Sequence, residues 1–460
     1  MFQAFANIFK IPELRRKVLF TIGIIALFRL GSFIPVPGID VKALKELFDS
    51  FAGGSVTGNL VAIGNLFTGG AISNAAIFGL GVMPYISASI IFQVLTVVWP
   101  TLQALSKEGE SGRKKIQQYV RITAVFLAFF QGAVILIGLS QIQSPRIVMT
   151  DNIVGYVLFG ALVITAGCML LMWLGEQIDE YGIGNGISII IMIGIVAQFI
   201  PAILTLAGKT NLKSITGFGT GEFGIFHIFI IIVVFAAMIV ATVLITRGQR
   251  RIPIQQARRT RGNRVYGGQR TYLPIGVNMV NVIPIIFAQA LFIIPNAIAG
   301  AKEGFDKVTN PIMYHFCGFF EFFGYGSFLY VILYVLLIIF FSYFYAAITF
   351  KPDEVADRMK QHGNFIPGIR PGKQTETYLE RILTHVTMFG SFCLAGIAIS
   401  PMFASGVFGV DFIVAGFFGG TGLLITVGVA LDLLAKIESH LMMHNYEGFL
   451  KKGKLKGRRG

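Results

Sequence analysis

The sequence predicts an all-α polytopic membrane protein with ten transmembrane helices. Three observations predict it: the composition, ten long apolar runs, and the distribution of basic residues between them. The 460 residues are 54% hydrophobic and only 13% charged, with a mean hydropathy of +0.72, which excludes an ordinary soluble globule. A helix needs about 20 apolar residues to cross roughly 30 Å of hydrocarbon. The ten runs are Val18–Val36, Ile77–Trp99, Ile116–Leu139, Ile153–Leu174, Ile183–Leu206, Phe223–Ile245, Leu273–Ile298, Phe322–Phe350, Ile382–Phe403 and Phe408–Ala435.

Basic residues lie mostly on one side of the membrane when alternate segments between the runs are counted. Thirty of the 38 Lys and Arg fall in the N-terminal segment, the even-numbered gaps and the C-terminal tail, with Arg121 at the start of the third run counted in the loop before it. Seven fall in the odd-numbered gaps, and Arg29 lies inside the first run. Because loops rich in Lys and Arg stay in the cytoplasm, we expect both termini to be cytoplasmic.

An even number of spans suggests two halves of five. Val82–Ile86 in the second run and Val282–Ile286 in the seventh match at three of five positions, at equivalent places in the two halves. An odd number of spans per half makes such a repeat inverted in the membrane. We expect an N-terminal half over residues 1–207, an exterior hinge over 208–221, a C-terminal half over 222–435 and a basic cytoplasmic tail over 436–460.

Two long cytoplasmic loops are predicted to be structured protrusions rather than linkers. The first, Arg247–Tyr272, carries eight Arg and no acidic residue. The second, Lys351–Arg381, carries mixed charge and the turn-rich stretch Phe365–Gly372. Membrane orientation alone stays open as the explanation of these charges. Eight arginines exceed what orientation needs, so the pattern favours a docking surface for RNA or an acidic protein.

The exterior stretch Asn59–Ala76 is moderately apolar and rich in glycine. Leu66–Phe67 and Ala71–Ile72 lie at helical spacing and predict a short half-helix that glycines separate from the second span. The segment is too short to cross the membrane. It is either a re-entrant segment that lines a cavity, because irregular backbone survives at membrane depth only there, or an interfacial helix on the outer surface.

Two pairs of aliphatic residues could form a constriction. Val82 and Ile86 in the second run, and Ile187 and Ile191 in the fifth, are each spaced i, i+4 and therefore share a helix face. Glycine and alanine close to both pairs would let the helices approach each other. A ring of such side chains would block ions by dewetting. Ordinary packing or lipid contact is the alternative for each of them.

Ionisable residues are scarce in the middle of the runs, which argues against ion-coupled transport. Arg29 lies about seven residues from the outer end of its run, close enough for its side chain to snorkel to the membrane surface. The polar residues deeper inside are neutral, among them Gln93, Asn281 and Gln289. We find no catalytic constellation and expect no catalytic residue, no metal and no cofactor. A secondary transporter with inverted repeats remains the alternative class.

Several long stretches, spread over essentially the whole chain, resemble the SecY family, the channel subunit of the bacterial Sec protein translocase. They are Gly31–Gly38, Met83–Ile90, Tyr181–Ser188, Arg247–Ile252, Arg264–Tyr266, Phe365–Gly372 and Leu455–Gly457. The resemblance implies a clamshell of two inverted five-helix halves around an hourglass pore. It implies a passive channel for unfolded polypeptides that also releases membrane segments sideways, with the energy supplied by a partner ATPase or by the translating ribosome.

The resemblance also assigns sites. The pore ring falls on Val82, Ile86, Ile187, Ile191, Ile283 and Ile425. A plug at about residues 65–76 includes Leu66, Phe67, Gly69, Gly70, Ala71 and Ile72. Polar residues of a lateral gate are expected at Ser87, Gln93, Asn278, Asn281 and Gln289. Residues that dock partners are expected at Arg247, Arg250, Arg251, Arg258, Arg259, Arg264 and Arg370.

The implied partners are of four kinds. Two small membrane subunits, SecE and SecG, would accompany the channel, and the SecA ATPase and the ribosome would dock on its cytoplasmic face. Signal sequences and nascent polypeptides would be its cargo, and anionic phospholipid would surround it. The implied location is the bacterial cytoplasmic (inner) membrane.

Overall fold

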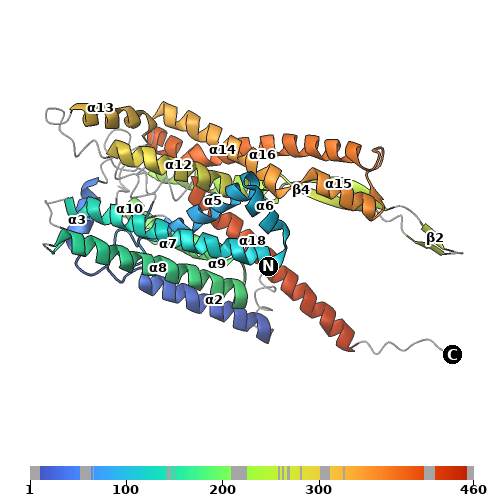
Figure 1. Cartoon of the computed structure of the whole chain (residues 1–460), viewed down its shortest axis with the longest axis horizontal. Helices are drawn as coiled ribbons and strands as arrows, with labels where there is room; N and C mark the ends of the chain where they lie inside the picture. The colour runs from blue at the N-terminus through green and yellow to red at the C-terminus, as the bar shows by residue number, and fades with distance from the viewer. Residues whose placement is uncertain are drawn as a thin grey trace. The chain divides into compact units, whose positions relative to one another are not determined.

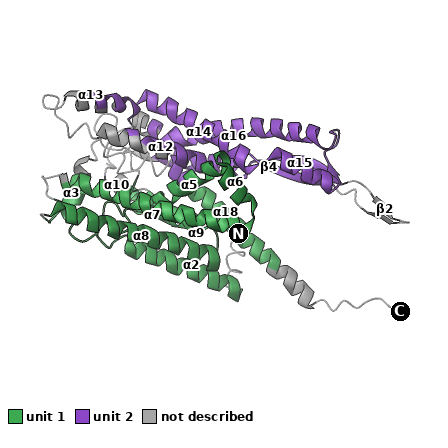
Figure 2. Cartoon of the chain, in the orientation of Figure 1, with its two compact units in different colours: residues 1–204, 425–460 green, residues 205–424 purple. Residues whose placement is uncertain are grey.

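A computed structural model describes most of the chain as two compact units. The described residues are 11–51, 64–65, 67–141, 147–150, 152–208, 225–256, 259–261, 264–266, 270–279, 282–300, 311–324, 327–408 and 420–452. The first unit holds residues 1–204 and 425–460, and the second holds residues 205–424 (Figure 2). These units differ from the expected halves at the last helix, because its residues after Leu424 belong with the first unit. Most of the expected hinge, 209–221, lies outside the described residues.

The first unit consists of helices. Two of them, α7 (Glu110–Gln141) and α8 (Ile153–Tyr181), pack against each other along their length (Figure 1). Small residues allow this close approach of α7 and α8, since Gly132 faces Ala161 and Gly160 faces Leu136. Polar side chains cap two of the helices: the Asn152 side chain accepts from the Gly155 N–H at the start of α8 and that of Asn185 from the Ser188 N–H at the start of α9. The helices are α2 (Pro12–Gly31), α3 (Val41–Phe51), α5 (Met83–Val98), α6 (Pro100–Lys107), α7 (Glu110–Gln141), α8 (Ile153–Tyr181), α9 (Gly186–Ala197), most of α10 (Phe199–Gly208) and most of α18 (Gly420–Lys452).

The second unit is a helical bundle with a small sheet at one end. Its bundle core gathers buried side chains from several helices, including Ile285, Ile338 and Leu394. Aromatic rings add to this core, with the Phe292 and Tyr330 centroids 4.4 Å apart. The helices are α11 (Ile225–Arg247), α12 (Ile283–Gly300), α13 (Pro311–Phe320), the 3₁₀ helix η2 (Glu321–Phe323), α14 (Phe328–Thr349), α15 (Pro352–Gln361) and α16 (Lys373–Phe408).

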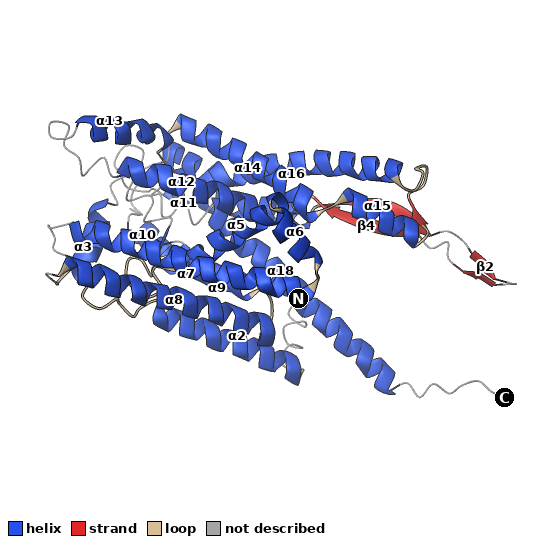
Figure 3. Cartoon of the chain, in the orientation of Figure 1, coloured by secondary structure: helices blue, strands red, loops and turns tan. Residues whose placement is uncertain are grey.

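Strands form at the end of the second unit where α15 lies (Figure 3). A three-stranded antiparallel sheet has the order β4-β1-β5, formed by β1 (Gln249–Gln256), β4 (Arg270–Gly276) and β5 (Asn364–Phe365). Burial alternates along β1, with Ile252 and Ile254 buried and the residues on either side of Ile252 exposed. A second antiparallel pair joins β2 (Arg259–Arg261) and β3 (Arg264–Tyr266).

Each of the ten predicted apolar runs overlaps a helix, which confirms the predicted fold class. Among the described residues, seven helices are long and apolar enough to cross a membrane. The pair α5 and α6 adds an eighth if it counts as one broken span, with a bend of 98°.

At the second and seventh predicted runs, the apolar sequence begins well before the helix. The second run was placed from Ile77, but its helix begins at Met83, because residues 77–82 form turns. The seventh was placed from Leu273, but Leu273–Gly276 lies in β4 and the helix begins at Ile283. Hydrogen bonds to β1 satisfy backbone N–H and C=O groups of the apolar β4 residues, so these groups do not need the hydrogen bonds of a helix. Both helices have proline at their second position, Pro84 and Pro284, where its missing N–H costs nothing.

Candidate functional site

The segment predicted as a plug is a short helical turn followed by a series of tight turns. We call residues 64–82 the plug segment; Leu66 within it lies outside the described residues. The chain is helical at 64–65 and 67–68 and then turns through Gly81, so the helix predicted to continue over Ala71–Ile72 was wrong. The reason is backbone geometry: φ is +68° at Gly69 and +86° at Gly70, values that L-residues rarely adopt and that end a right-handed helix.

Hydrogen bonds within the plug segment fold it back on itself. The side-chain oxygen of Asn65 accepts from the Ser73 N–H at 3.0 Å, and its backbone oxygen accepts from the Gly70 N–H at 3.0 Å. The Thr68 hydroxyl donates to the Gly64 carbonyl at 3.0 Å. These bonds satisfy polar groups that would otherwise be costly at membrane depth.

The plug segment packs through Gly69 and Gly70 against α9 and the residue that follows it. A Cβ at Gly69 would lie 3.0 Å from the Cα of Gly194, and one at Gly70 would lie 2.6 Å from the side-chain nitrogen of Gln198. Phe67 is only 7% exposed and Ala71 fully buried. The sequence predicted no contact partners for the plug, and a glycine in α9 is the signal that could have pointed to this packing, because small residues let chain segments approach closely.

The other end of the plug segment pairs with the chain that follows α2. Pro35 and Ala76 form an antiparallel bridge. The Val36 N–H donates to the Ala75 carbonyl at 2.8 Å, and the Ile77 N–H donates to the Ile34 carbonyl at 2.9 Å. These bonds join backbone to backbone, so they fix this end of the segment independently of side-chain identity.

Arg29, whose distance from the end of the run would let its side chain snorkel, contacts the plug segment. Its Nη1 donates to the Gly69 carbonyl at 3.0 Å, and its guanidinium carbon lies 5.2 Å from the ring centroid of Phe33. Sequence spacing showed the distance of Arg29 from the end of its apolar run. It did not identify its hydrogen-bond partner, Gly69, which is 40 residues further along the chain.

Five of the six predicted ring residues lie in the first unit, and four of them form two pairs spaced one helical turn apart. Val82 is buried at the start of α5, and the Ile86 N–H donates to its carbonyl at 3.0 Å. Ile187 and Ile191 are one turn apart on α9, and Ile191 is buried. The start of α9 is fixed by Asp179, whose side chain accepts from the Gly186 N–H at 2.8 Å.

The remaining two ring residues lie at helix starts with different exposure. Ile283 is the first residue of α12 and is 36% exposed, whereas Ile425 near the start of α18 is 2% exposed. The ring of six, which draws on both units, stays a prediction.

The predicted lateral-gate residues differ in their surroundings. Ser87 is half-buried, and exposed Gln93 donates to the Ser89 hydroxyl at 3.3 Å. Asn278 is buried, and Gln289 donates to the Thr421 hydroxyl at 3.4 Å. Asn281 lies outside the described residues.

A groove of about 210 Å³ lies between α5 and α7. It is lined by Tyr85, Ser89, Phe92, Gln93, Thr96, Arg113, Ile116, Gln117 and Val120. Next to it, Arg121 of α7 forms an ion pair with Glu176 of α8 at 2.7 Å, which the sequence reasoning missed. An arginine inside an apolar run is the signal that could have prompted a search for its acid.

The two long loops fold together into one protrusion with its own apolar core. Buried side chains from both loops meet in it, among them Ile252 and Ile254 of the first loop and Ile366 of the second. The prediction of structured protrusions is confirmed for the described residues. Of the predicted docking residues, Arg247, Arg250, Arg251 and Arg370 are exposed, Arg259 and Arg264 lie in β2 and β3, and Arg258 lies outside the described residues.

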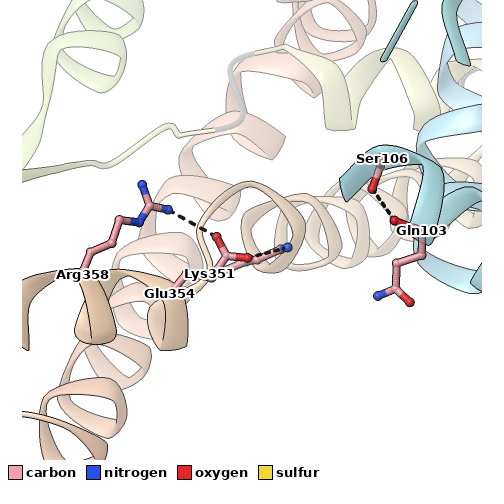
Figure 4. A network of polar contacts seen from close by, with 5 residues as sticks. All are labelled: Gln103, Ser106, Lys351, Glu354 and Arg358. Carbon is pink, nitrogen blue, oxygen red and sulfur yellow. Dashed lines mark hydrogen bonds and ion pairs between the residues drawn. The ribbon is translucent and has the colours of Figure 1, made fainter. Parts of the chain in front are cut away.

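Ion pairs and turns shape the second loop. Figure 4 shows Glu354 of α15 between Lys351 at 3.0 Å and Arg358 at 3.3 Å, together with the Ser106–Gln103 hydrogen bond of α6. The hydrogen bond from Lys351, and then its charge, hold the pKa of the Glu354 carboxyl below its ordinary value.

The turn that presents Arg370 has glycine on both sides. Gly368 and Gly372 both have positive φ, which frees the turn to present Arg370 to solvent, and the Arg370 carbonyl accepts from the Thr375 hydroxyl at 3.0 Å.

The fold and these features define a multi-pass α-helical membrane protein. The family model for SecY matches residues 76–434. The chain is 41% identical over 461 residues to the protein translocase subunit SecY of Thermotoga maritima, covering all of both chains. It is 43% identical over 448 residues to that of Escherichia coli K12, covering 97% of this chain and 96% of the relative. The chain belongs to the SecY family.

Solved structures of similar fold cover 95% of this chain and 96% of their own. One is a protein-conducting channel, with a TM-score of 0.57 and 18% identity. Another is a SecY protein whose plug domain is described as stabilising the closed state and maintaining a membrane seal, with a TM-score of 0.58 and 18% identity. A third is Sec61 in the canine ribosome-channel complex, with a TM-score of 0.52 and 17% identity.

Proposed function

We propose that this chain is the protein-conducting channel subunit of a translocase. It passes unfolded polypeptides across the cytoplasmic membrane of a bacterium and releases apolar segments sideways into the lipid. The observation that carries this function is sequence identity along essentially the full length of the chain to proteins that are protein translocase subunits.

The ring and the plug segment seal the channel at rest. The ring consists of Val82, Ile86, Ile187, Ile191, Ile283 and Ile425. Aliphatic side chains exclude water from a narrow passage, and they form no lasting hydrogen bonds with a polypeptide that slides past them. The buried, internally hydrogen-bonded plug segment, packed against α9, supports this role.

Apolar partitioning decides which segments leave the channel for the lipid. A signal sequence is an apolar helix, and it gains about 25 cal/mol for each Å² of apolar surface that it removes from water. A polar chain has no such gain and continues across the membrane. We assign Ser87, Gln93, Asn278, Asn281 and Gln289 to the gate through which the apolar helix leaves.

The energy comes from partners that dock on the protrusion. The channel itself binds no nucleotide; a SecA-type ATPase or a translating ribosome supplies the push, and small SecE- and SecG-type subunits brace the helices. The exposed Arg250, Arg251 and Arg370 and the folded sheet beneath them support docking on acidic protein or RNA. The similar fold of the Sec61 channel in a ribosome complex supports the same assignment.

Orientation follows from charge. The protrusion and both termini face the cytoplasm, because the segments that contain them hold most of the 38 Lys and Arg. On this face the basic residues also meet anionic phospholipid.

Ion conductance of the resting channel tests the seal. Replacing Ile86, Ile187 and Ile191 together by Ser should raise the conductance of reconstituted membranes roughly tenfold or more, because a polar lining lets the constriction wet. The control replaces three exposed isoleucines, Ile122, Ile135 and Ile153, by Ser and should leave conductance unchanged. Equal conductance of the two triple variants would refute the ring.

A further inference from the structure

Arg29 is a cation inside an apolar span, where a charge is costly and is usually retained for a function. It lies in the last turn of α2 and is half-buried. Arg29 belongs to none of the proposed sites, which are the ring, the plug, the lateral gate and the docking surface. Its place in the helix would allow it to reach the outer surface, yet the side chain turns inward to the plug segment.

The contact that Arg29 makes is specific to one point of the plug segment. Its Nη1 donates to the Gly69 carbonyl at 3.0 Å. Phe33, one turn further along the chain, lies against the guanidinium and steadies it by a cation–π contact. Gly69 also faces Gly194 of α9, so this residue is held between α9 on one side and the Arg29 side chain on another.

The two ends of the plug segment are attached by different kinds of bonds. The end near Ala75 and Ala76 is attached by the backbone bridge to Pro35, and the Asn74 side chain adds a bond to the Ser32 carbonyl at 3.3 Å. The tip near Gly69 is attached to α2 by a long, flexible side chain. A side chain can swing away without unfolding its helix, whereas the backbone bridge holds its end in place.

We propose that Arg29 is the latch of the plug segment: its guanidinium holds the tip closed through the Gly69 carbonyl, and opening breaks this bond while the segment turns about its fixed end near Ala76. The proposal rests on the proposed sealing role of the plug segment. Arg29 is a positioning residue, because it acts on the seal through Gly69 and not through contact with cargo.

Substitution of Arg29 tests the latch in the full chain, reconstituted in lipid vesicles. Arg29→Met keeps an unbranched, flexible side chain, shorter than that of arginine, and removes the charge and the hydrogen-bond donors. We expect the resting ion conductance to rise by roughly 10- to 100-fold, the change in the open population that follows from losing one charge-assisted hydrogen bond. Arg29→Lys keeps a charge and one donor, and should give an intermediate conductance. Lys42→Met, which removes an exposed cation from the nearby α3, is the matched control and should leave conductance unchanged.

A second measurement reports the plug segment directly. In a background where the native cysteines are replaced by Ala, Thr68→Cys places a thiol at a position that is buried when the segment is closed. Arg29→Met should speed labelling of this thiol, by a maleimide that does not cross membranes, by roughly the same factor as it raises conductance. Unchanged labelling and unchanged conductance in Arg29→Met would overturn the latch.

A double variant separates the latch from a general loosening of the helices. Deleting residues 64–76 removes the tip that Arg29 holds, so Arg29→Met should add nothing to the conductance of the deletion variant. A further increase there would show that Arg29 acts on the bundle, and would overturn the proposal. If the deletion variant itself does not leak, the sealing role of the plug segment fails; if it leaks but Arg29→Met does not, only the latch fails.

Discussion

Gly194 of α9 and Gly69 of the plug segment approach each other at backbone distance, and neither position has room for a side chain. A Cβ at Gly194 would lie 2.7 Å from the Phe67 carbonyl oxygen and 3.3 Å from the Gly69 nitrogen. These atoms belong to backbone, which cannot rotate away as a flexible side chain can. The close packing of the plug segment on α9 therefore depends on the absence of a side chain at Gly194.

Gly194→Ala should displace the plug segment and raise the resting ion conductance several-fold, because the added methyl overlaps the backbone of Phe67. Planar-bilayer recording of the purified channel measures this. The matched control is Gly23→Ala in α2, where a Cβ would meet nothing within 4 Å and should stabilise the helix by about 0.5–1 kcal/mol. Conductance of Gly194→Ala equal to that of Gly23→Ala would contradict the packing argument.

Residue-level prediction from sequence worked where a local pattern was enough. The i, i+4 spacing of Val82 with Ile86 placed both on successive turns, as the structure has them. It failed for Arg29, whose partner is distant in sequence. Nothing local in the chain marks the Gly69 carbonyl as an acceptor, so only the fold could reveal that pair.

The protrusion shows how two loops become one structural element. β1 offers Ile252 and Ile254 on one face, β4 adds Ile275, and Ile366 next to β5 comes from the second loop. Burying these apolar side chains together holds the loops in a fixed arrangement, with the arginines on the outside. Sequence indicated structure here through its apolar residues, but the strands were not predicted, because β4 runs on into residues that were assigned to the seventh apolar run and β5 comes from the second loop.

Arg370→Glu should slow ATPase-driven export at least about tenfold while leaving the membrane topology unchanged. Arg370 is exposed on a turn between two glycines of positive φ, so the substitution changes the charge offered to a partner without disturbing the core beneath it. Uptake of a precursor by inverted membrane vesicles measures export. Lys360→Glu, an exposed cation on α15 of the same loop, is the control. Equal export by the two variants would refute the docking role of Arg370.

At the scale of the whole chain, the length of the apolar runs and the charge between them predicted the number and type of the spans, because long apolar runs between basic segments leave few alternatives. They did not predict α13 (Pro311–Phe320), which is too short to register as a span. They also misplaced the start of the seventh run, since an apolar strand such as β4 and the start of an apolar helix look alike over four residues.

The function proposed for the whole chain requires a sealed passage for polypeptide, powered from outside the chain. The absence of paired charges deep in the predicted spans weighed against a solute-binding transporter, and the family of the chain agrees with that interpretation. In this proposal the aliphatic ring and the basic protrusion serve the same transport process, since the ring would admit a moving chain and the protrusion would receive the partner that drives it.

Protection of a precursor protein from protease tests this claim most directly. The purified chain, with its small membrane subunits, is reconstituted in vesicles, and a radiolabelled precursor with a signal sequence is added with the ATPase and ATP. A protein-conducting channel predicts that the precursor becomes resistant to external protease only when channel, ATPase and ATP are all present, and becomes sensitive again when detergent opens the vesicles. A protected fraction no larger than that of vesicles without the channel would contradict it.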